Sequence, residues 1–99
     1  MNPIPRATMT HSLKTLPEFW DAVDRGDKTF EVRAADRDFR VGDTLNLIRV
    51  MDVFITPSAD GWVQPSPLRS LFRVISYVLP GGRFGIEPGY VVLGFSNDW

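Results

Sequence analysis

A chain of 99 residues with 43% hydrophobic and 23% charged residues is long enough for one domain with a modest core and too apolar for global disorder. It has no cysteine and a single histidine, His11, which excludes disulfides, thiol nucleophiles and metal sites built from cysteines or several histidines. The net charge of −1 argues against a polybasic nucleic-acid surface, so any anion-binding surface must be local.

The N-terminal segment, residues 1–8, contains two prolines and is expected to form a loose arm ahead of a single domain over residues 9–99. It lacks the apolar core of a secretory signal, and no apolar run in the chain is long enough to span a membrane. We therefore expect a cytoplasmic protein with no membrane partner. Residues 9–14 are then predicted to form the first strand.

The next segment has the pattern of a short amphipathic helix. Thr15-Leu16-Pro17-Glu18 is typical of a capping box, with threonine as the N-cap, proline in the first turn and glutamate three residues after the threonine. Gly26 supplies a C-terminal stop. The apolar side chains that recur at helical spacing between these signals are Leu16, Phe19, Trp20 and Val23.

Alternation with a period of two begins after this helix, in residues 28–33. A strand here places Phe30 and Val32 on one face and sets Glu31 beside Arg33 on the other, with Lys28 at the mouth of the strand. A carboxylate between two cations stays ionised, so this trio can hold a phosphate or the Watson–Crick edge of a base. The alternative is a solvated ladder of ion pairs, worth less than about 1 kcal/mol per pair. The spacing leaves both interpretations open.

The following segment, Asp36-Arg37-Asp38-Phe39-Arg40, also allows two interpretations. It is either a turn whose Phe39 packs on the core, or it adds Arg37 or Arg40 to the rim of the same cleft.

The remaining strands are predicted over residues 44–50, 68–79 and 90–95, with a hairpin or long loop over 52–63. The segment 68–79 is apolar on both faces, which predicts a strand buried on both sides. Five or six strands with one or two helices predict a mainly β, α+β fold. We expect a small, curled β-barrel with a helix closing one end.

Few other residues carry a signal for chemistry. Trp62 and Tyr90 are candidates for stacking on a base, whereas Trp20 and the lone His11 are expected to pack as ordinary residues. No nucleophile triad, paired carboxylates or calcium loop is readable, so no cofactor or metal is expected.

Several segments together resemble the family called domain of unknown function 3850. That family is common in bacteria and phages and belongs to the ASCH branch of the PUA-like superfamily. The matching segments are His11–Lys14, the helix ending at Gly26, residues 28–33, Asp36–Phe39, Val41–Asp43, Phe84–Ile86 and Gly89–Gly94.

The resemblance implies a PUA-like β-barrel whose cleft, between barrel and helix, is lined by Lys28, Glu31 and Arg33. Related domains bind RNA or read modified bases. The expected function is therefore binding of RNA, a nucleotide or a modified nucleoside, with Arg37 at the rim. Relatives often carry a basic residue and an asparagine where this chain has Ala34-Ala35, and the loss of two polar contacts argues against tight polymer binding.

Two alternatives stay open. A similar small ASCH branch hydrolyses N4-acetylcytidine with a lysine at the position of Lys28, a threonine where this chain has Glu31, and a glutamate from a helical insertion. If the chain is an enzyme of this type or a ribonuclease, Lys28 and Glu31 are its expected catalytic pair. A protein-interaction module is favoured instead if residues 53–55 and Trp62 form an exposed apolar patch.

Overall fold

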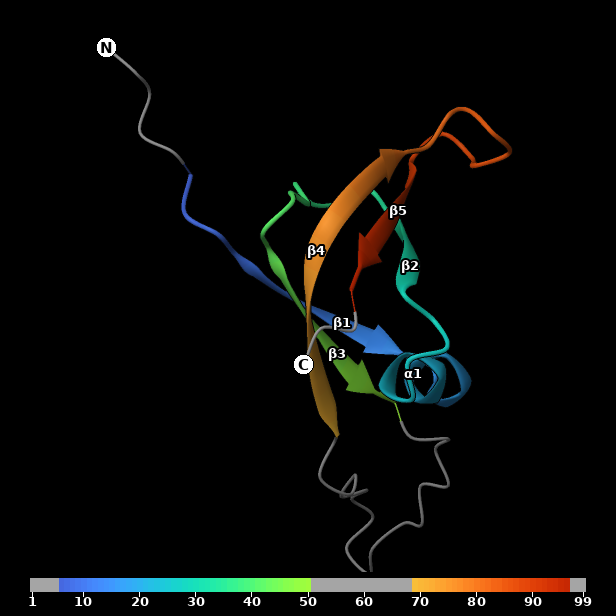
Figure 1. Cartoon of the computed structure of the whole chain (residues 1–99). Helices are drawn as coiled ribbons and strands as arrows, with labels where there is room; N and C mark the ends of the chain where they lie inside the picture. The colour runs from blue at the N-terminus through green and yellow to red at the C-terminus, as the bar shows by residue number, and fades with distance from the viewer. Residues whose placement is uncertain (1–5, 51–68, 97–99) are drawn as a thin grey trace, which may run out of the picture.

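The computed structural model describes residues 6–50 and 69–96. Within these ranges the chain forms five strands and one helix, which confirms the predicted mainly β fold (Figure 1). In chain order they are β1 (Thr10–Thr15), α1 (Pro17–Asp24), β2 (Phe30–Ala34), β3 (Thr44–Arg49), β4 (Ser70–Pro80) and β5 (Tyr90–Phe95). The predicted hairpin over 52–63, Trp62 and the candidate patch at 53–55 lie outside the described residues.

The five strands form one curled sheet in the order β1-β3-β4-β5-β2. The long strand β4 pairs with β3 along its first half and with β5 along its second half, and the register shifts between Ile75 and Tyr77. Such an irregularity bends a strand and increases its local twist. The sheet therefore folds over on itself as a half-barrel, which brings its two edge strands, β1 and β2, toward each other (Figure 1).

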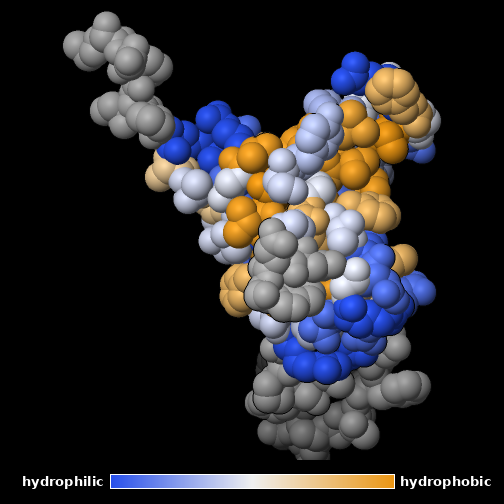
Figure 2. All heavy atoms as spheres, viewed as in Figure 1, coloured by the Kyte–Doolittle hydropathy of each residue, from blue (hydrophilic) through white to orange (hydrophobic). Residues whose placement is uncertain are grey.

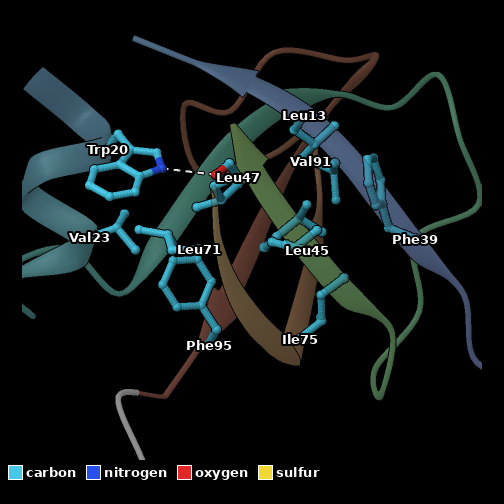
Figure 3. Packing of buried hydrophobic residues seen from close by; sticks show 11 residues of the cluster. Leu13, Trp20, Val23, Phe39, Leu45, Leu47, Leu71, Ile75, Val91 and Phe95 are labelled. Atoms are coloured by element: carbon cyan, nitrogen blue, oxygen red, sulfur yellow. Dashed lines mark hydrogen bonds between the residues drawn. The ribbon is translucent and has the colours of Figure 1, made fainter. Parts of the chain in front are cut away.

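The core lies inside the half-barrel, where alternate residues of the strands meet two residues of α1. Trp20 anchors the helix because its indole Nε1 donates a 2.9 Å hydrogen bond to the carbonyl oxygen of Leu47 in β3 (Figure 3). Trp20 is thus a core residue, as predicted. The buried apolar residues are Leu13, Trp20, Val23, Phe39, Leu45, Leu47, Leu71, Ile75, Val91, Leu93 and Phe95.

Leu45→Ala should lower the free energy of unfolding by about 2–5 kcal/mol, because the side chain is fully buried and its removal leaves a cavity. Urea unfolding checks this loss. Val41→Ala, at an exposed position, is the matched control and should change stability by no more than about 0.5 kcal/mol. Equal effects of the two substitutions would contradict this assignment of the core.

The start of α1 differs from the prediction, although Pro17 opens the helix as expected. Leu16, not Thr15, is the N-cap residue, and no side chain in the described part of the chain caps the helix. The Thr15 hydroxyl belongs to β1 and donates to the carbonyl oxygen of Leu13 at 3.2 Å. Thr15 is therefore part of strand β1, although the capping pattern predicted it as the N-cap of the helix. At the other end, Gly26 has a φ of +87°, which favours glycine, just after the last helical turn.

Strand β4 is buried on one face only, which corrects the prediction of burial on both sides. Phe72 and Val74 point away from the core and are 59% and 54% exposed. The helix closes one end of the half-barrel instead of covering its outer face, so only the inner face of β4 is enclosed. Figure 2 shows apolar side chains reaching the surface over the upper part of the molecule, where β4 and β5 lie.

A buried charged cluster connects the first described residues to the barrel. Asp43 is fully buried, and its carboxylate accepts hydrogen bonds from the Arg6 guanidinium at 3.0 Å and from His11 Nε2 at 2.8 Å. The segment expected to be a loose arm is described from Arg6 onward, and Arg6 is held to the barrel by this contact. His11 also lies 4.7 Å from the Phe39 ring, so it is a packed residue.

Candidate functional site

The two edge strands β1 and β2 meet along a seam that arginine side chains bridge. Arg33 in β2 donates to the carbonyl oxygen of Lys14 and to the Thr15 hydroxyl, both at 2.9 Å. Arg37 donates to the carbonyl oxygen of Ser12 at 3.1 Å. These side chains donate hydrogen bonds to carbonyl groups of an edge strand. Such groups, when unpaired, can pair with a strand of another chain. We call this line of contacts, residues 12–15 against residues 33–37, the seam.

The trio predicted from sequence comes together at one end of the seam. Lys28 Nζ donates to Glu31 Oε1 at 2.7 Å, and Arg33 Nε donates to Glu31 Oε2 at 3.2 Å. Glu31 is only 4% exposed, whereas its neighbours Phe30 and Val32 are each nearly half exposed. The strand parity was predicted correctly. The alternative of a solvated ladder is wrong, because the charged face of β2 is the one turned inward.

Two phenyl rings flank the Lys28 ammonium. Its nitrogen lies 5.2 Å from the ring centres of Phe19, on α1, and of Phe30, on β2, which is within the range of cation–π attraction. Both rings are more than 40% exposed. They face a cleft of about 450 Å³, which we call the aromatic cleft and which is lined by Lys14, Thr15, Leu16, Phe19, Lys28, Phe30, Glu31, Val32 and Arg33.

Sequence reasoning missed both rings as site residues. The sequence pattern places Phe19 among the apolar residues at helical spacing and Phe30 on the apolar face of the strand. The usable signal is that Phe30 stands two residues after Lys28, at the position where β2 begins. An apolar residue at the start of an edge strand has a neighbouring strand on one side only, so its side chain can stay exposed to a ligand.

A second cleft of about 350 Å³ lies farther along the seam. We call it the basic cleft, and it is lined by Ser12, Leu13, Lys14, Arg33, Ala34, Asp36, Arg37 and Phe39. Lys14 and Arg33 line both clefts, so the Arg33–Lys14 contact lies between them. The predicted rim residue Arg37 belongs to this second cleft.

Other candidates from the sequence lie elsewhere. Tyr90 pairs with Ala34 at the far end of β2 and lines neither cleft. Arg40 forms an ion pair with Asp38 at 2.7 Å and also lines neither. Among the described residues no group of three or more His, Asp or Glu side chains could hold a metal ion.

The match to known families covers nearly the whole described domain. The model of the family described as Domain of unknown function (DUF3850) matches residues 10–95, a span that includes both clefts and every strand. The chain belongs to the DUF3850 family. No curated protein matches the chain.

The chemistry available to this DUF3850 domain follows from which groups are already engaged. All three nitrogens of the Arg33 guanidinium donate hydrogen bonds within the protein. Arg33 therefore holds the seam together and fixes the carboxylate of Glu31. Lys28 gives Glu31 one of its three N–H donors, and a carboxylate has about four acceptor sites. The aromatic cleft therefore offers a donor, an acceptor and two ring faces.

Within residues 6–50 and 69–96, no helix has the length and apolar character needed to cross a membrane.

Proposed function

We propose that the aromatic cleft binds the base of a nucleotide, a modified nucleoside or an RNA residue. The observation that carries this proposal is the Lys28 ammonium, held between Phe19 and Phe30 beside the buried carboxylate of Glu31. A concave, mostly apolar site with a few convergent polar groups is typical of small-molecule recognition. Stacking of a base on an aromatic ring contributes about 1–3 kcal/mol to binding, and it does so for every type of base.

The polar groups suit a base with an exocyclic amine beside a carbonyl oxygen or a ring nitrogen. Lys28 donates to the acceptor, and Glu31 accepts from the amine, as carboxylates accept from the amine of cytosine. Cytosine, guanine and adenine carry such an edge, whereas uracil has no exocyclic amine. Arg33 acts as a positioning residue, because its donors orient the carboxylate instead of meeting the ligand.

The resemblance to the ASCH branch of the PUA-like superfamily supports the same proposal, since related domains bind RNA or modified bases. We further infer from this resemblance that the protein acts in the cytoplasm of a bacterium and is of bacterial or phage origin. The departure at Ala34-Ala35 favours a short ligand over tight binding along a polymer.

Calorimetric titration of the full chain with cytidine, guanosine and uridine tests the proposal. We expect cytidine or guanosine to bind more tightly than uridine. Lys28→Met, which keeps an unbranched side chain between the two rings, should weaken this binding by about 10- to 100-fold, because it removes one charged hydrogen bond. Phe30→Ala should weaken binding to all three nucleosides by a similar factor.

The matched control for the lysine variant is Arg83→Gln, which removes an exposed cation in the loop between β4 and β5, away from both clefts. It should leave binding unchanged. Affinities of Lys28→Met equal to those of the wild type would refute the proposed site.

The hydrolase alternative would use the same Lys28–Glu31 pair, which stands in the cleft at hydrogen-bonding distance. Incubation with N4-acetylcytidine distinguishes the two functions. Release of acetate by the wild type and none by Lys28→Met would favour hydrolysis, whereas binding without acetate release favours recognition.

A further inference from the structure

The basic cleft contains a cation with no partner in the described part of the chain. Lys14 is exposed at the end of β1, and no described side chain or carbonyl engages its ammonium group in a hydrogen bond or ion pair. Its main-chain carbonyl, in contrast, is occupied by Arg33. The amine of Lys14 is thus available to a ligand at the point where the two clefts join.

Arg37 supplies a second cation to the same cleft. One of its terminal nitrogens donates to the Ser12 carbonyl oxygen, and its Nε lies 3.7 Å from Asp36 Oδ1, which leaves further N–H donors for a ligand. The Asp36 carboxylate is largely exposed to solvent. The Ser12 hydroxyl accepts from the Asn46 amide at 3.3 Å, and within residues 6–50 and 69–96 it donates to no acceptor, so a ligand can take its hydrogen.

The charges of the cleft favour an anion. Lys14 and Arg37 are opposed by the single carboxylate of Asp36, whereas Arg33 shares the buried carboxylate of Glu31 with Lys28. The residues that line this cavity include an ammonium, a guanidinium and a hydroxyl, which are groups that bind phosphate in proteins.

The position of this cleft relative to the aromatic cleft fits the two ends of a nucleotide. Along β1, the aromatic cleft is lined by residues 14–16 and the basic cleft by residues 12–14. The two-residue offset corresponds to about 7 Å along a strand, a separation that one ribose bridges. A base stacked at Phe30 would therefore direct its phosphate past the Arg33–Lys14 contact and toward Arg37.

We propose that the basic cleft binds the phosphate group of the nucleotide whose base occupies the aromatic cleft, an inference that rests on the proposed function. The phosphate is either the monoester of a free nucleotide or a diester linkage in RNA. Both present negatively charged non-bridging oxygens to Lys14, Arg37 and Ser12, three in the monoester and two in the diester.

Titration with paired ligands tests the inference on the full chain. The probes are cytidine and cytidine 5′-monophosphate, with guanosine and its monophosphate as a second pair. The wild type should bind each nucleotide about tenfold or more tightly than its nucleoside, and the difference should shrink as salt is added. Arg37→Gln, at a residue that lines the basic cleft and not the aromatic cleft, should remove most of this difference while leaving the affinity for the nucleoside unchanged.

Further variants and ligands separate the possible roles. Ala34→Lys, which adds a cation to the wall of the basic cleft, should increase the preference for the nucleotide. A dinucleoside monophosphate that binds as tightly as the mononucleotide would identify the diester as the source, and weaker binding would identify the monoester. Arg83→Gln is again the control for loss of a cation outside the clefts.

Some results would overturn the inference without touching the proposed function. Equal affinities for nucleoside and nucleotide would do so, and so would an Arg37→Gln variant that weakens both ligands equally. If neither nucleoside nor nucleotide binds, the proposed function fails, and inorganic phosphate becomes the probe. Phosphate-induced chemical-shift changes at Ser12 and Lys14 that Arg37→Gln abolishes would retain a phosphate site alone, and their absence would reject it.

Discussion

Replacing Asp43 with asparagine is expected to lower the free energy of unfolding by about 3–5 kcal/mol, the typical cost of removing one partner from a buried charged group. Asp43 has no measurable exposure, and its two oxygens accept five hydrogen bonds. The donors are two nitrogens of Arg6, His11 Nε2 and the main-chain N–H groups of Met9 and Arg40. An asparagine amide would turn its own N–H groups toward some of these donors.

Urea unfolding at neutral pH measures the loss. Asp38→Asn is the matched control, because Asp38 also forms ion pairs with arginines but is mostly exposed. Its variant should unfold at nearly the wild-type urea concentration. If the two substitutions had the same effect, the cluster around Asp43 would contribute no more than a surface ion pair.

The same carboxylate predicts how stability depends on pH. The hydrogen bond from Arg6, followed by those from His11 and the backbone, holds the pKa of Asp43 far below its ordinary value, against the opposing effect of burial. A lowered pKa in the folded state means that the contribution to stability is complete above the ordinary aspartate pKa, near 4, and is lost progressively as the pH falls below it. The acid-induced loss of stability should therefore be smaller in Asp43→Asn than in the wild type.

Glu31→Gln is expected to affect both stability and ligand binding. The substitution removes the charge that Lys28 and Arg33 share in the half-barrel, and each lost charged hydrogen bond costs about 1.5–3 kcal/mol. It also replaces one acceptor oxygen with a donor, so a base whose amine faces the carboxylate should bind about 10- to 100-fold more weakly. Unfolding and nucleoside titration, performed on the same preparation, separate the two effects.

The control for Glu31 is Asp27→Asn. Asp27 forms an ion pair of 2.6 Å with Arg25, but both side chains are well exposed. This variant should retain the wild-type urea midpoint and nucleoside affinity. A Glu31→Gln protein that is fully stable and binds cytidine normally would show that the buried carboxylate has neither role.

The sequence predicted the local features of the candidate site well. The period of two in residues 28–33 placed Glu31 beside Arg33, and Pro17 and Gly26 marked the ends of the helix. The first and last residues of β1 and β3 were predicted to within one position. These features depend on backbone geometry and on neighbours a few residues away, which are readable along the chain.

The roles of individual aromatic and cationic residues were less readable. The sequence shows Phe19 and Phe30 only as members of apolar patterns, whereas in the structure they form the walls of a cleft. Lys14 had no motif of its own and gained its position from the approach of β1 to the end of β2. Contacts of this kind join residues far apart in the chain, and no spacing rule records them.

By itself, the sequence determined that Glu31 and Arg33 stand at alternating positions of one strand after a short helix, with Lys28 just ahead of that strand. Only the tertiary structure decided that this charged face is buried while its apolar neighbours are exposed. The reason is that strand periodicity sorts side chains onto two faces, but burial depends on what covers each face. Here the curl of the sheet at β4 brings β1 and α1 over the side of β2 that carries Glu31.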